Sequence, residues 1–218
     1  MNYCFISGFS QPSSTLEILA NKMSSKKTML TSPEELYPNY IPKLNEQIKD
    51  KCVLVGWSMG GSIVLEYAST YPEKVEKIIL ISSTASFLKN KDNEIGIEPA
   101  RLEALSNGIV NSKETALKRF ISKFSSKSTH EYLKNALKIK NDILIHNLNY
   151  FKKDLRFIAK EIKIKTLIFH DKQDKIIPFS HAEKLHNLLQ NSELFTTNEF
   201  GHILEEENSK FIALQCQK

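Results

Sequence analysis

The sequence predicts an α/β protein, in which a mostly parallel sheet is covered by helices on both faces and a block of helices is inserted between two strands. Short aliphatic runs alternate along the chain with segments whose apolar residues recur at helical spacing. The runs are apolar at successive positions, as strands buried on both faces are. Between 86 and 160 the alternation gives way to lysine-rich amphipathic segments without a convincing strand. We therefore expect one compact domain, with a core formed by 1–85 and 161–218 and a helical cap formed by 86–160.

Strand and helix alternate before residue 52. Tyr3–Ile6 is an apolar run that ends at Ser7-Gly8, which is typical of a buried strand followed by a loop. Ser13 and Ser14 are residue types that cap helix N-termini, so a helix should begin close after them. The elements predicted in this part are strands at 3–6 and 27–30 and helices at about 15–23 and 41–49.

The next strand and helix meet at a glycine-rich corner. The aliphatic run Cys52–Val55 is followed by Gly-Trp-Ser-Met-Gly-Gly at 56–61, and helical spacing resumes at Ser62. Pro72 ends that helix, and the run Ile78–Ile81 lies within a central strand at 75–82. After the insertion we predict strands at 165–170 and 193–196 and helices at about 180–189 and at the C-terminus.

Ser58 stands at the centre of this corner. In a G-x-S-x-G turn between a strand and a helix, small flanking residues let two backbone segments pass closely and tolerate a strained nucleophile. The serine Oγ is then exposed above the sheet edge, and unpaired N–H groups of the following helix face any developing oxyanion. An ordinary glycine-rich turn is the alternative, but the strand, turn and helix that the motif requires are all present. Ser58 is therefore our candidate nucleophile.

A nucleophilic serine needs a base, and the base needs an orienting acid. Ser58, Asp174 and His202 occur in the chain order that accompanies this turn. Asp174 follows one late strand and His202 the next, so parallel strands would bring both to the edge that carries Ser58. Asp171 is the rival acid, although its place beside the strand end favours a role in the turn, and His170 is expected to be a buried neighbour. The histidines expected to be solvated or structural are His130, His146, His181 and His186.

Composition limits the class of protein further. At 218 residues, with 41% apolar and 25% charged residues, the chain is long enough to bury one sizeable core. It contains no apolar run that could span a membrane and no signal-peptide pattern, so we expect a cytoplasmic protein. Its three cysteines, without metal-ligand spacing, are expected to be free thiols. We expect a monomer that has no metal or other cofactor and does not bind membranes. Binding to nucleic acid is not expected either, because the basic residues are not interleaved with an aromatic platform.

These motifs resemble those of the α/β-hydrolase superfamily over essentially the whole chain. The resemblance rests on the turn at 56–61, on Asp174 four residues before Pro178, and on Gly201-His202. The segment after the strand at 75–82 is similar to the opening of the cap in pimeloyl-[acyl-carrier protein] methyl ester carboxylesterases of biotin synthesis. Those enzymes also carry Gly-Trp-Ser, an aliphatic residue and two glycines at the turn. The residues that carry this second resemblance are Ser82–Phe87, Asp92, Gly96-Ile97, Pro99, Leu102 and Arg119-Phe120.

The chain departs from the family pattern in two places. Family members usually begin with a β-hairpin, whereas this chain starts almost directly with its first parallel strand, so we expect an α/β-hydrolase sheet of about six strands that lacks the N-terminal hairpin. The usual His-Gly of the oxyanion loop is Ser7-Gly8 here. Because the donors in such loops are backbone N–H groups, the resemblance still assigns the oxyanion hole to the amides of Phe9 and Met59.

The resemblance implies a serine carboxylesterase with a Ser58-Asp174-His202 triad that hydrolyses an ester of an acyl chain, specifically the methyl ester of pimeloyl-acyl carrier protein. A broad-specificity carboxylesterase, a thioesterase and a hydrolase-fold lyase of menaquinone synthesis are alternatives on the same scaffold. A catalytically idle binding protein is a further alternative, for which Ser7 in place of histidine is the only hint.

Positive charge is concentrated in the insertion. From Lys89 to Lys165 there are 17 Lys and Arg against 9 Asp and Glu, a net charge of +8 in a chain of +5. A basic surface over the site would attract an acidic partner, and the resemblance implies an acyl carrier protein. Solvated helix faces are an equally good explanation of the lysines. The candidate carrier-binding residues are Lys118, Arg119, Lys123, Lys127, Lys152 and Arg156.

An acyl chain requires an apolar pocket beside the nucleophile. Trp57 flanks Ser58 in the sequence, and Ser82 ends the neighbouring strand. Packing of the cap phenylalanines against the core is an alternative to a role in binding. The candidate substrate-binding residues are Trp57, Ser82, Phe87, Phe120 and Phe124.

Overall fold

The sheet is parallel throughout. The computed structural model describes residues 1–23, 26–124 and 129–217. Six strands lie in the order β2-β1-β3-β4-β5-β6, and every neighbouring pair is parallel. Each predicted strand is present within a few residues of its predicted bounds. The strands are β1 (Asn2–Ile6), β2 (Lys27–Thr31), β3 (Cys52–Trp57), β4 (Val75–Ile81), β5 (Thr166–Asp171) and β6 (Ser192–Thr197).

The strand register aligns the ends from which the site is built. Gly56 of β3 pairs with Ile6 of β1 on one side and with Leu80 of β4 on the other. Ile81, the last residue of β4, pairs with Phe169 of β5. The loops that follow these four strands therefore leave the sheet at the same edge, where open parallel sheets bind their ligands.

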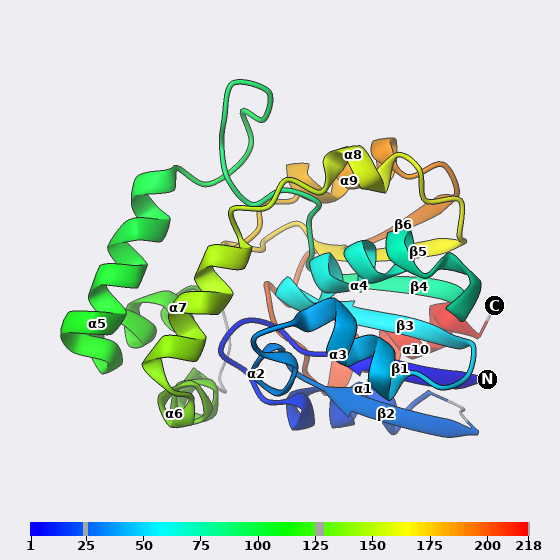
Figure 1. Cartoon of the computed structure of the whole chain (residues 1–218), viewed down its shortest axis with the longest axis horizontal. Helices are drawn as coiled ribbons and strands as arrows, with labels where there is room; N and C mark the ends of the chain where they lie inside the picture. The colour runs from blue at the N-terminus through cyan, green and yellow to red at the C-terminus, as the bar shows by residue number, and fades with distance from the viewer. Residues whose placement is uncertain (24–25, 125–128, 218) are drawn as a thin grey trace.

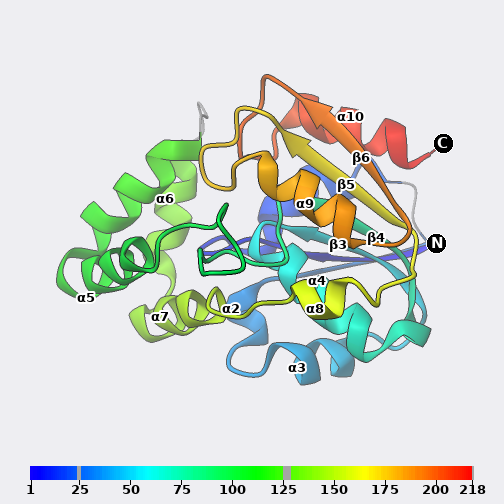
Figure 2. The ribbon, with the colours of Figure 1, turned by 90° about the horizontal axis from the view of Figure 1, so that it is seen from above.

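Helices cover both faces of the sheet, as the apolar strands require. In Figures 1 and 2, α3, α4, α8 and α9 lie on one face, and α1 and α10 lie together on the other. The predicted helix at 15–23 is shorter than expected, since Ser13–Leu16 is a 3-10 turn and only four residues follow as α-helix. The helices of these two layers are α1 (Glu17–Ala20), α2 (Pro33–Leu36), α3 (Tyr40–Gln47), α4 (Met59–Thr70), α8 (Arg156–Ala159), α9 (Ser180–Leu188) and α10 (Glu206–Cys216).

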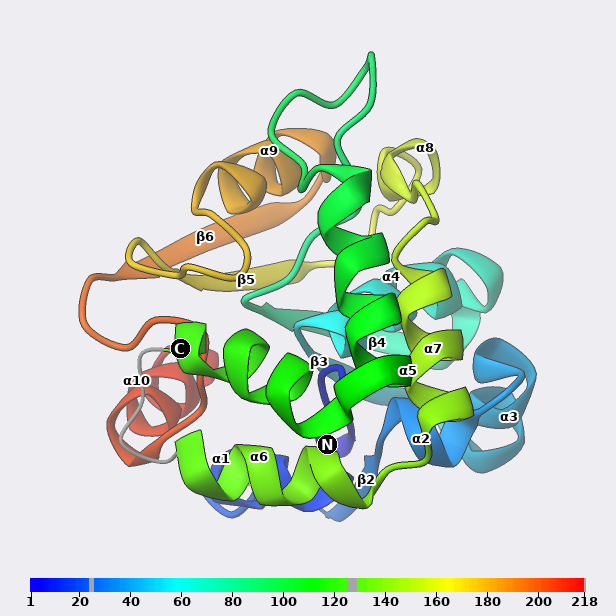
Figure 3. The ribbon, with the colours of Figure 1, turned by 90° about the vertical axis from the view of Figure 1, so that its left-hand side faces the viewer.

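The insertion between β4 and β5 lies beyond the carboxyl ends of the strands. Its helices are α5 (Pro99–Ile121), α6 (Thr129–Lys138) and α7 (Asn141–Tyr150), and Figure 3 shows them in front of that edge of the sheet. Two parts of the predicted cap differ from expectation. Residues 86–98 form a loop with isolated β-bridges, and α8 packs against α4 and α9 of the core. Within the described ranges, no helix is long and apolar enough to cross a membrane.

The cap helix α5 is bent at Ser112, whose φ of −157° and ψ of 77° are not helical. The side chain of Lys113 donates hydrogen bonds to the carbonyls of Leu137 and Ile139 at the end of α6. The two halves of α5 approach each other closely near the bend, because a Cβ on Gly108 would lie 2.9 Å from the Ala116 Cβ. The result is a V-shaped helix over the edge of the sheet (Figure 3).

Candidate active site

The corner between β3 and α4 holds Ser58 in a strained conformation. Its φ of 54° and ψ of −120° lie in a region that non-glycine residues rarely adopt. The amide of Ser58 donates to the Ile81 carbonyl at 2.9 Å, and the Ser83 hydroxyl donates to the Ser58 carbonyl at 2.8 Å. A Cβ on Gly56 would overlap the Gly61 backbone, so this close crossing requires glycine. The strain is therefore maintained by contacts on both sides of the serine.

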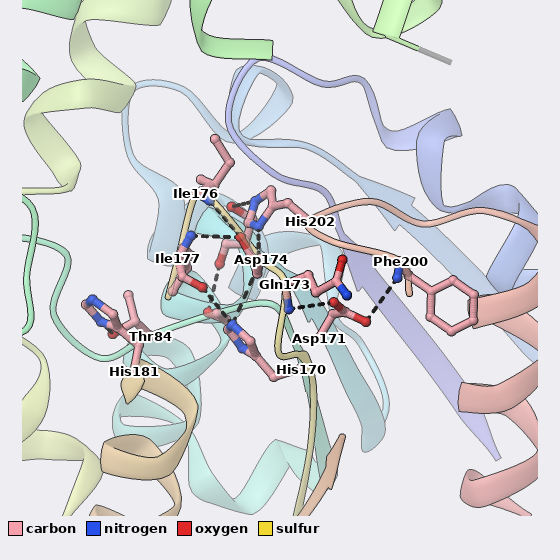
Figure 4. A network of polar contacts seen from close by, with 12 residues as sticks. Thr84, His170, Asp171, Gln173, Asp174, Ile176, Ile177, His181, Phe200 and His202 are labelled. Atoms are coloured by element: carbon pink, nitrogen blue, oxygen red, sulfur yellow. Dashed lines mark hydrogen bonds and ion pairs between the residues drawn. The ribbon is translucent and has the colours of Figure 1, made fainter. Parts of the chain in front are cut away.

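Three side chains from three different loops meet at this corner. His202 Nε2 lies 3.0 Å from Ser58 Oγ, and His202 Nδ1 lies 2.7 Å from Asp174 Oδ2. All three residues are buried, and Figure 4 shows Asp174 and His202 facing each other at the strand ends. The sequence placed Ser58 at the corner before α4 and the other two residues on separate late loops, and the structure brings all three into one hydrogen-bonded series. Such a series transfers a proton from the serine to the histidine while the carboxylate orients the ring.

The loop after β5 holds Asp174 as a carboxylate. Its Oδ1 accepts hydrogen bonds from the amides of Ile176 and Ile177 at 2.8 and 2.9 Å. Burial alone would raise the pKa of Asp174, but the attraction of His202 and the hydrogen bonds outweigh it, so the pKa lies below its usual value. His170 is the predicted buried neighbour: its Nε2 lies 2.8 Å from the Ile177 carbonyl and 3.6 Å from Asp174 Oδ2.

Asp171, the rival acid, faces a different loop. Its side chain hydrogen-bonds to the amides of Gln173, Glu199 and Phe200. The carboxyl group is therefore occupied by backbone donors, and it is Asp174 that contacts the imidazole.

The predicted oxyanion donors lie on either side of Ser58. Met59 is the first residue of α4, where a backbone N–H has no partner within the helix. The loop carrying Phe9 passes directly beside the nucleophile, since a Cβ on Gly8 would lie 3.1 Å from the Ser58 Cβ. The Ser7 hydroxyl, in the place of the usual histidine, donates to the Gln11 carbonyl at 2.7 Å. Ser7 thus stabilises the loop internally.

A cavity of about 430 Å³ opens above Ser58 and His202. Four of the five predicted substrate-binding residues line it, namely Trp57, Phe87, Phe120 and Phe124. Ser82 does not line it. Its positive φ turns it toward a smaller space under the loop after β6, which it lines with Phe169 and Asp171. The cavity walls are mostly apolar, which suits an acyl chain.

Four exposed cations also line the cavity, and we refer to Arg101, Arg119, Lys123 and Lys175 as the cationic rim. None of the four forms an ion pair with a described residue, and the cavity lining contains no Asp or Glu. The sequence predicted Arg119 and Lys123 but missed the other two. Lys175 was recognisable from its position directly after Asp174, because the loop that delivers the acid also delivers its neighbour. Arg101 could not be recognised from the sequence, because its place at the cavity depends on how the first half of α5 is positioned.

The other predicted carrier-binding residues that the structure describes do not line this cavity. Lys118 is exposed on α5, and Lys152 lines a shallow groove between α5 and α7. Arg156 forms an ion pair with Asp154 at 2.6 Å and donates to the Asp92 carbonyl. Its guanidinium is thus already occupied within the chain. Lys127 lies outside the described residues.

His181 lines the cavity and is the structural kind of histidine, one of the two alternatives that the sequence left open for it. It is buried, and its Nδ1 lies 2.9 Å from the Thr84 hydroxyl oxygen. Burial lowers the pKa of His181 to about 4, since a charged ring would lose its hydration there. The ring is therefore neutral at physiological pH.

We expect the buried His181 to make the fold sensitive to acid. The unfolded chain binds a proton near pH 6.5 and the folded chain only near 4, so folding stability falls between these values by up to about 3 kcal/mol. The melting temperature of His181→Gln should accordingly fall less than that of the wild type between pH 7 and pH 5. His130→Gln, at an exposed position, serves as the control. Equal losses in all three proteins would contradict the prediction.

The fold and the arrangement of Ser58, His202 and Asp174 are those of an α/β-hydrolase. The family model described as serine aminopeptidase, S33, matches residues 39–209. The chain belongs to this family.

Known relatives support the same class. A pimeloyl-[acyl-carrier protein] methyl ester esterase of Nitrosospira multiformis is 38% identical over 81 residues, which are 37% of this chain and 31% of that protein. The AB hydrolase superfamily protein YisY of Bacillus subtilis is 29% identical over 177 residues, 77% of this chain and 66% of that protein. The chain thus spans less than two thirds of either relative. A solved esterase of Exiguobacterium antarcticum matches the fold with a TM-score of 0.88 at 22% identity, over 100% of this chain and 91% of that one.

Proposed function

We propose that this protein is a serine carboxylesterase that hydrolyses the methyl ester of pimeloyl-acyl carrier protein in biotin biosynthesis. The observation that supports an esterase most directly is the hydrogen-bonded series of Ser58, His202 and Asp174 beside an apolar cavity. The substrate is suggested by relatives that carry the name of this esterase. The division into an 86–160 cap and a two-part core belongs to the same proposal, with the cap providing the walls that select the acyl chain.

The reaction is acyl transfer to water in two steps. Ser58 Oγ attacks the ester carbonyl while His202 Nε2 takes its proton, and Asp174 stabilises the imidazolium that forms. The amides of Phe9 and Met59 bind the oxyanion. His202 then returns the proton to the departing methoxide, which leaves as methanol. Water attacks the acyl-serine in the same way, so that the free acid and Ser58 are released.

The cationic rim supports an acidic carrier as the partner. Four cations that form no ion pair with a described residue create a positive field at the cavity, which attracts an acidic protein and the phosphate of its arm. The apolar walls then receive the acyl chain.

The substrate proposal is tested by comparing kcat/KM for two esters. We expect the methyl ester of pimeloyl-acyl carrier protein to be preferred by about 100-fold or more over a short free ester. Only the carrier-bound ester contacts both the cationic rim and the apolar walls of the cavity. Complementation of biotin auxotrophy in cells that lack their own esterase is the matching test in vivo. Equal turnover of both esters would instead identify a broad carboxylesterase.

Reversing charge at the rim should weaken carrier use selectively. The double variant Arg119→Glu with Lys123→Glu is expected to lower kcat/KM for the carrier-bound ester by about 10- to 100-fold at low salt. The loss should shrink as ionic strength rises, since exposed charges are screened. Turnover of a short neutral ester should stay within about twofold, because the substitutions leave the Ser58 corner intact.

The double variant Lys160→Glu with Lys163→Glu is the control for net charge, because both lysines are exposed and neither lines the cavity. An equal loss on both esters, or an equal loss in the control, would contradict a docking role of the rim.

A further inference from the structure

Asp171 is a buried carboxylate beside the site that takes no part in the reaction steps described above. It is the last residue of β5, three positions before Asp174. Successive side chains of a strand point to opposite faces, so His170 points toward Asp174 while Asp171 points toward the loop after β6. Figure 4 shows the two carboxylates facing different loops.

The Asp171 carboxylate bridges two loops. Its Oδ1 accepts a hydrogen bond from the Gln173 amide at 2.8 Å, within the loop that carries Asp174. Its Oδ2 accepts three hydrogen bonds from the end of β6 and the loop that carries His202. The donors are the Thr197 hydroxyl at 2.6 Å and the amides of Glu199 at 2.9 Å and Phe200 at 3.0 Å. One side chain therefore connects the loop of the acid to the loop of the base.

The bridge is strong because the carboxylate is ionised. Burial would raise the pKa of Asp171, but the hydrogen bonds from Phe200, Thr197 and Gln173 outweigh burial, and the pKa lies below its usual value. Hydrogen bonds to an ionised acceptor are shorter and stronger than neutral ones. Loss of the carboxylate would leave buried donors without a partner, which is costly.

The anchored amides stand directly before the base. Only Gly201, with a φ of 66°, separates Phe200 from His202, and a glycine at positive φ offers little resistance to rotation by itself. On the other side, the Trp57 ring N–H donates to the His202 carbonyl at 2.9 Å. The backbone of His202 is thus fixed by Asp171 from one direction and by Trp57 from the other.

We infer that Asp171 is a positioning residue that joins the two loops and thereby sets the distance between Asp174 and His202. This inference rests on the proposed serine hydrolase function. A displacement of about 1 Å in a catalytic group lowers rates by about 100-fold, so a bridge of this kind affects the rate of reaction more than the binding of substrate.

The test uses a fluorophosphonate, which reacts covalently with an activated serine. In Asp171→Asn, one acceptor becomes an N–H₂ donor that faces backbone donors. We expect the rate of labelling at Ser58 and kcat for a short ester to fall by about 10- to 100-fold while KM changes little. The final labelled fraction should remain that of the wild type, because it counts folded sites. A structural role alone would lower that fraction and leave the rate per labelled site unchanged, and this result would overturn the inference.

A milder pair of variants covers the case in which Asp171→Asn does not fold. Thr197→Val removes the shortest of the hydrogen bonds to Asp171, whereas Thr196→Val changes the exposed neighbour on the opposite face of β6. We expect Thr197→Val to slow labelling by about three- to tenfold and Thr196→Val to leave it unchanged. Equal rates in these two variants would also overturn the inference. A wild-type protein that resists the label contradicts the serine hydrolase proposal itself, and with it the groups that Asp171 would position.

Discussion

Ser58→Ala should abolish ester hydrolysis, with a loss of about 10⁴- to 10⁶-fold in kcat. The reason is that His202 Nε2 then has no hydroxyl to activate. Ser58 Oγ lies 3.0 Å from this nitrogen, and no other serine hydroxyl of the described residues is hydrogen-bonded to it. Substrate binding should persist, because the apolar walls and the cationic rim are untouched. The measurement is kcat for a short ester together with fluorophosphonate labelling, which should disappear.

Ser122→Ala is the matched control, since this exposed hydroxyl, just after α5, donates to the Arg119 carbonyl and does not line the cavity. It should retain wild-type activity. Activity of Ser58→Ala within about tenfold of the wild type would rule out Ser58 as the nucleophile.

The same position also allows a test of stored strain. Ser58→Gly removes the same hydroxyl but tolerates a φ of 54°, so it should be more stable than Ser58→Ala by about 1 kcal/mol. Both variants should be inactive. If Ser58→Gly is inactive but more stable than Ser58→Ala, the strained backbone at this corner lowers the stability of the fold while it presents the nucleophile.

Local pattern was sufficient to predict the sheet and the loops that follow its strands. The aliphatic runs identify β1, β3, β4 and β5 because a strand buried on both faces has no polar side to interrupt it. Parallel pairing then forces the loops bearing Ser58, Asp174 and His202 to one edge. The fold and the edge at which the site lies were therefore accessible from the aliphatic runs, the turn at 56–61 and the chain order, while Asp171 stayed open as the rival acid.

The shape of the cap was not accessible in this way. The bend of α5 at Ser112 is accompanied by hydrogen bonds from Lys113 to the carbonyls at the end of α6, a contact between segments more than 20 residues apart. That bend places Arg101 and Arg119, on separate halves of α5, along one cavity. Charge counts located the positive charge in the insertion, but they could not separate Arg119 from Arg156, whose guanidinium is already paired with Asp154. The Arg156–Asp154 pair is local, whereas the distant contacts of α5 decide which cations line the cavity.

Choosing between the two aspartates after β5 is the sharpest remaining test of the site. Both side chains are buried and both accept backbone hydrogen bonds. The pKa of each lies below the usual range. In Asp171 the hydrogen bonds outweigh the effect of burial, and in Asp174 the attraction of His202 outweighs it. Neither burial nor charge state therefore distinguishes them. The difference is the 2.7 Å contact between Asp174 Oδ2 and His202 Nδ1, which Asp171 lacks.

Asp174→Asn should lower kcat by about 10⁴-fold while the fold persists. The asparagine oxygen can still accept the amides of Ile176 and Ile177, but its N–H₂ group then faces His202 Nδ1. This favours the tautomer that carries its proton on Nε2, which cannot accept the proton of Ser58. Asp171→Asn is the matched comparison, with an expected loss of only about 10- to 100-fold, because it displaces the base without changing its tautomer. A larger loss in Asp171→Asn than in Asp174→Asn would exchange the two roles, since a carboxylate that only holds two loops in place cannot matter more than one that holds the proton on the correct nitrogen.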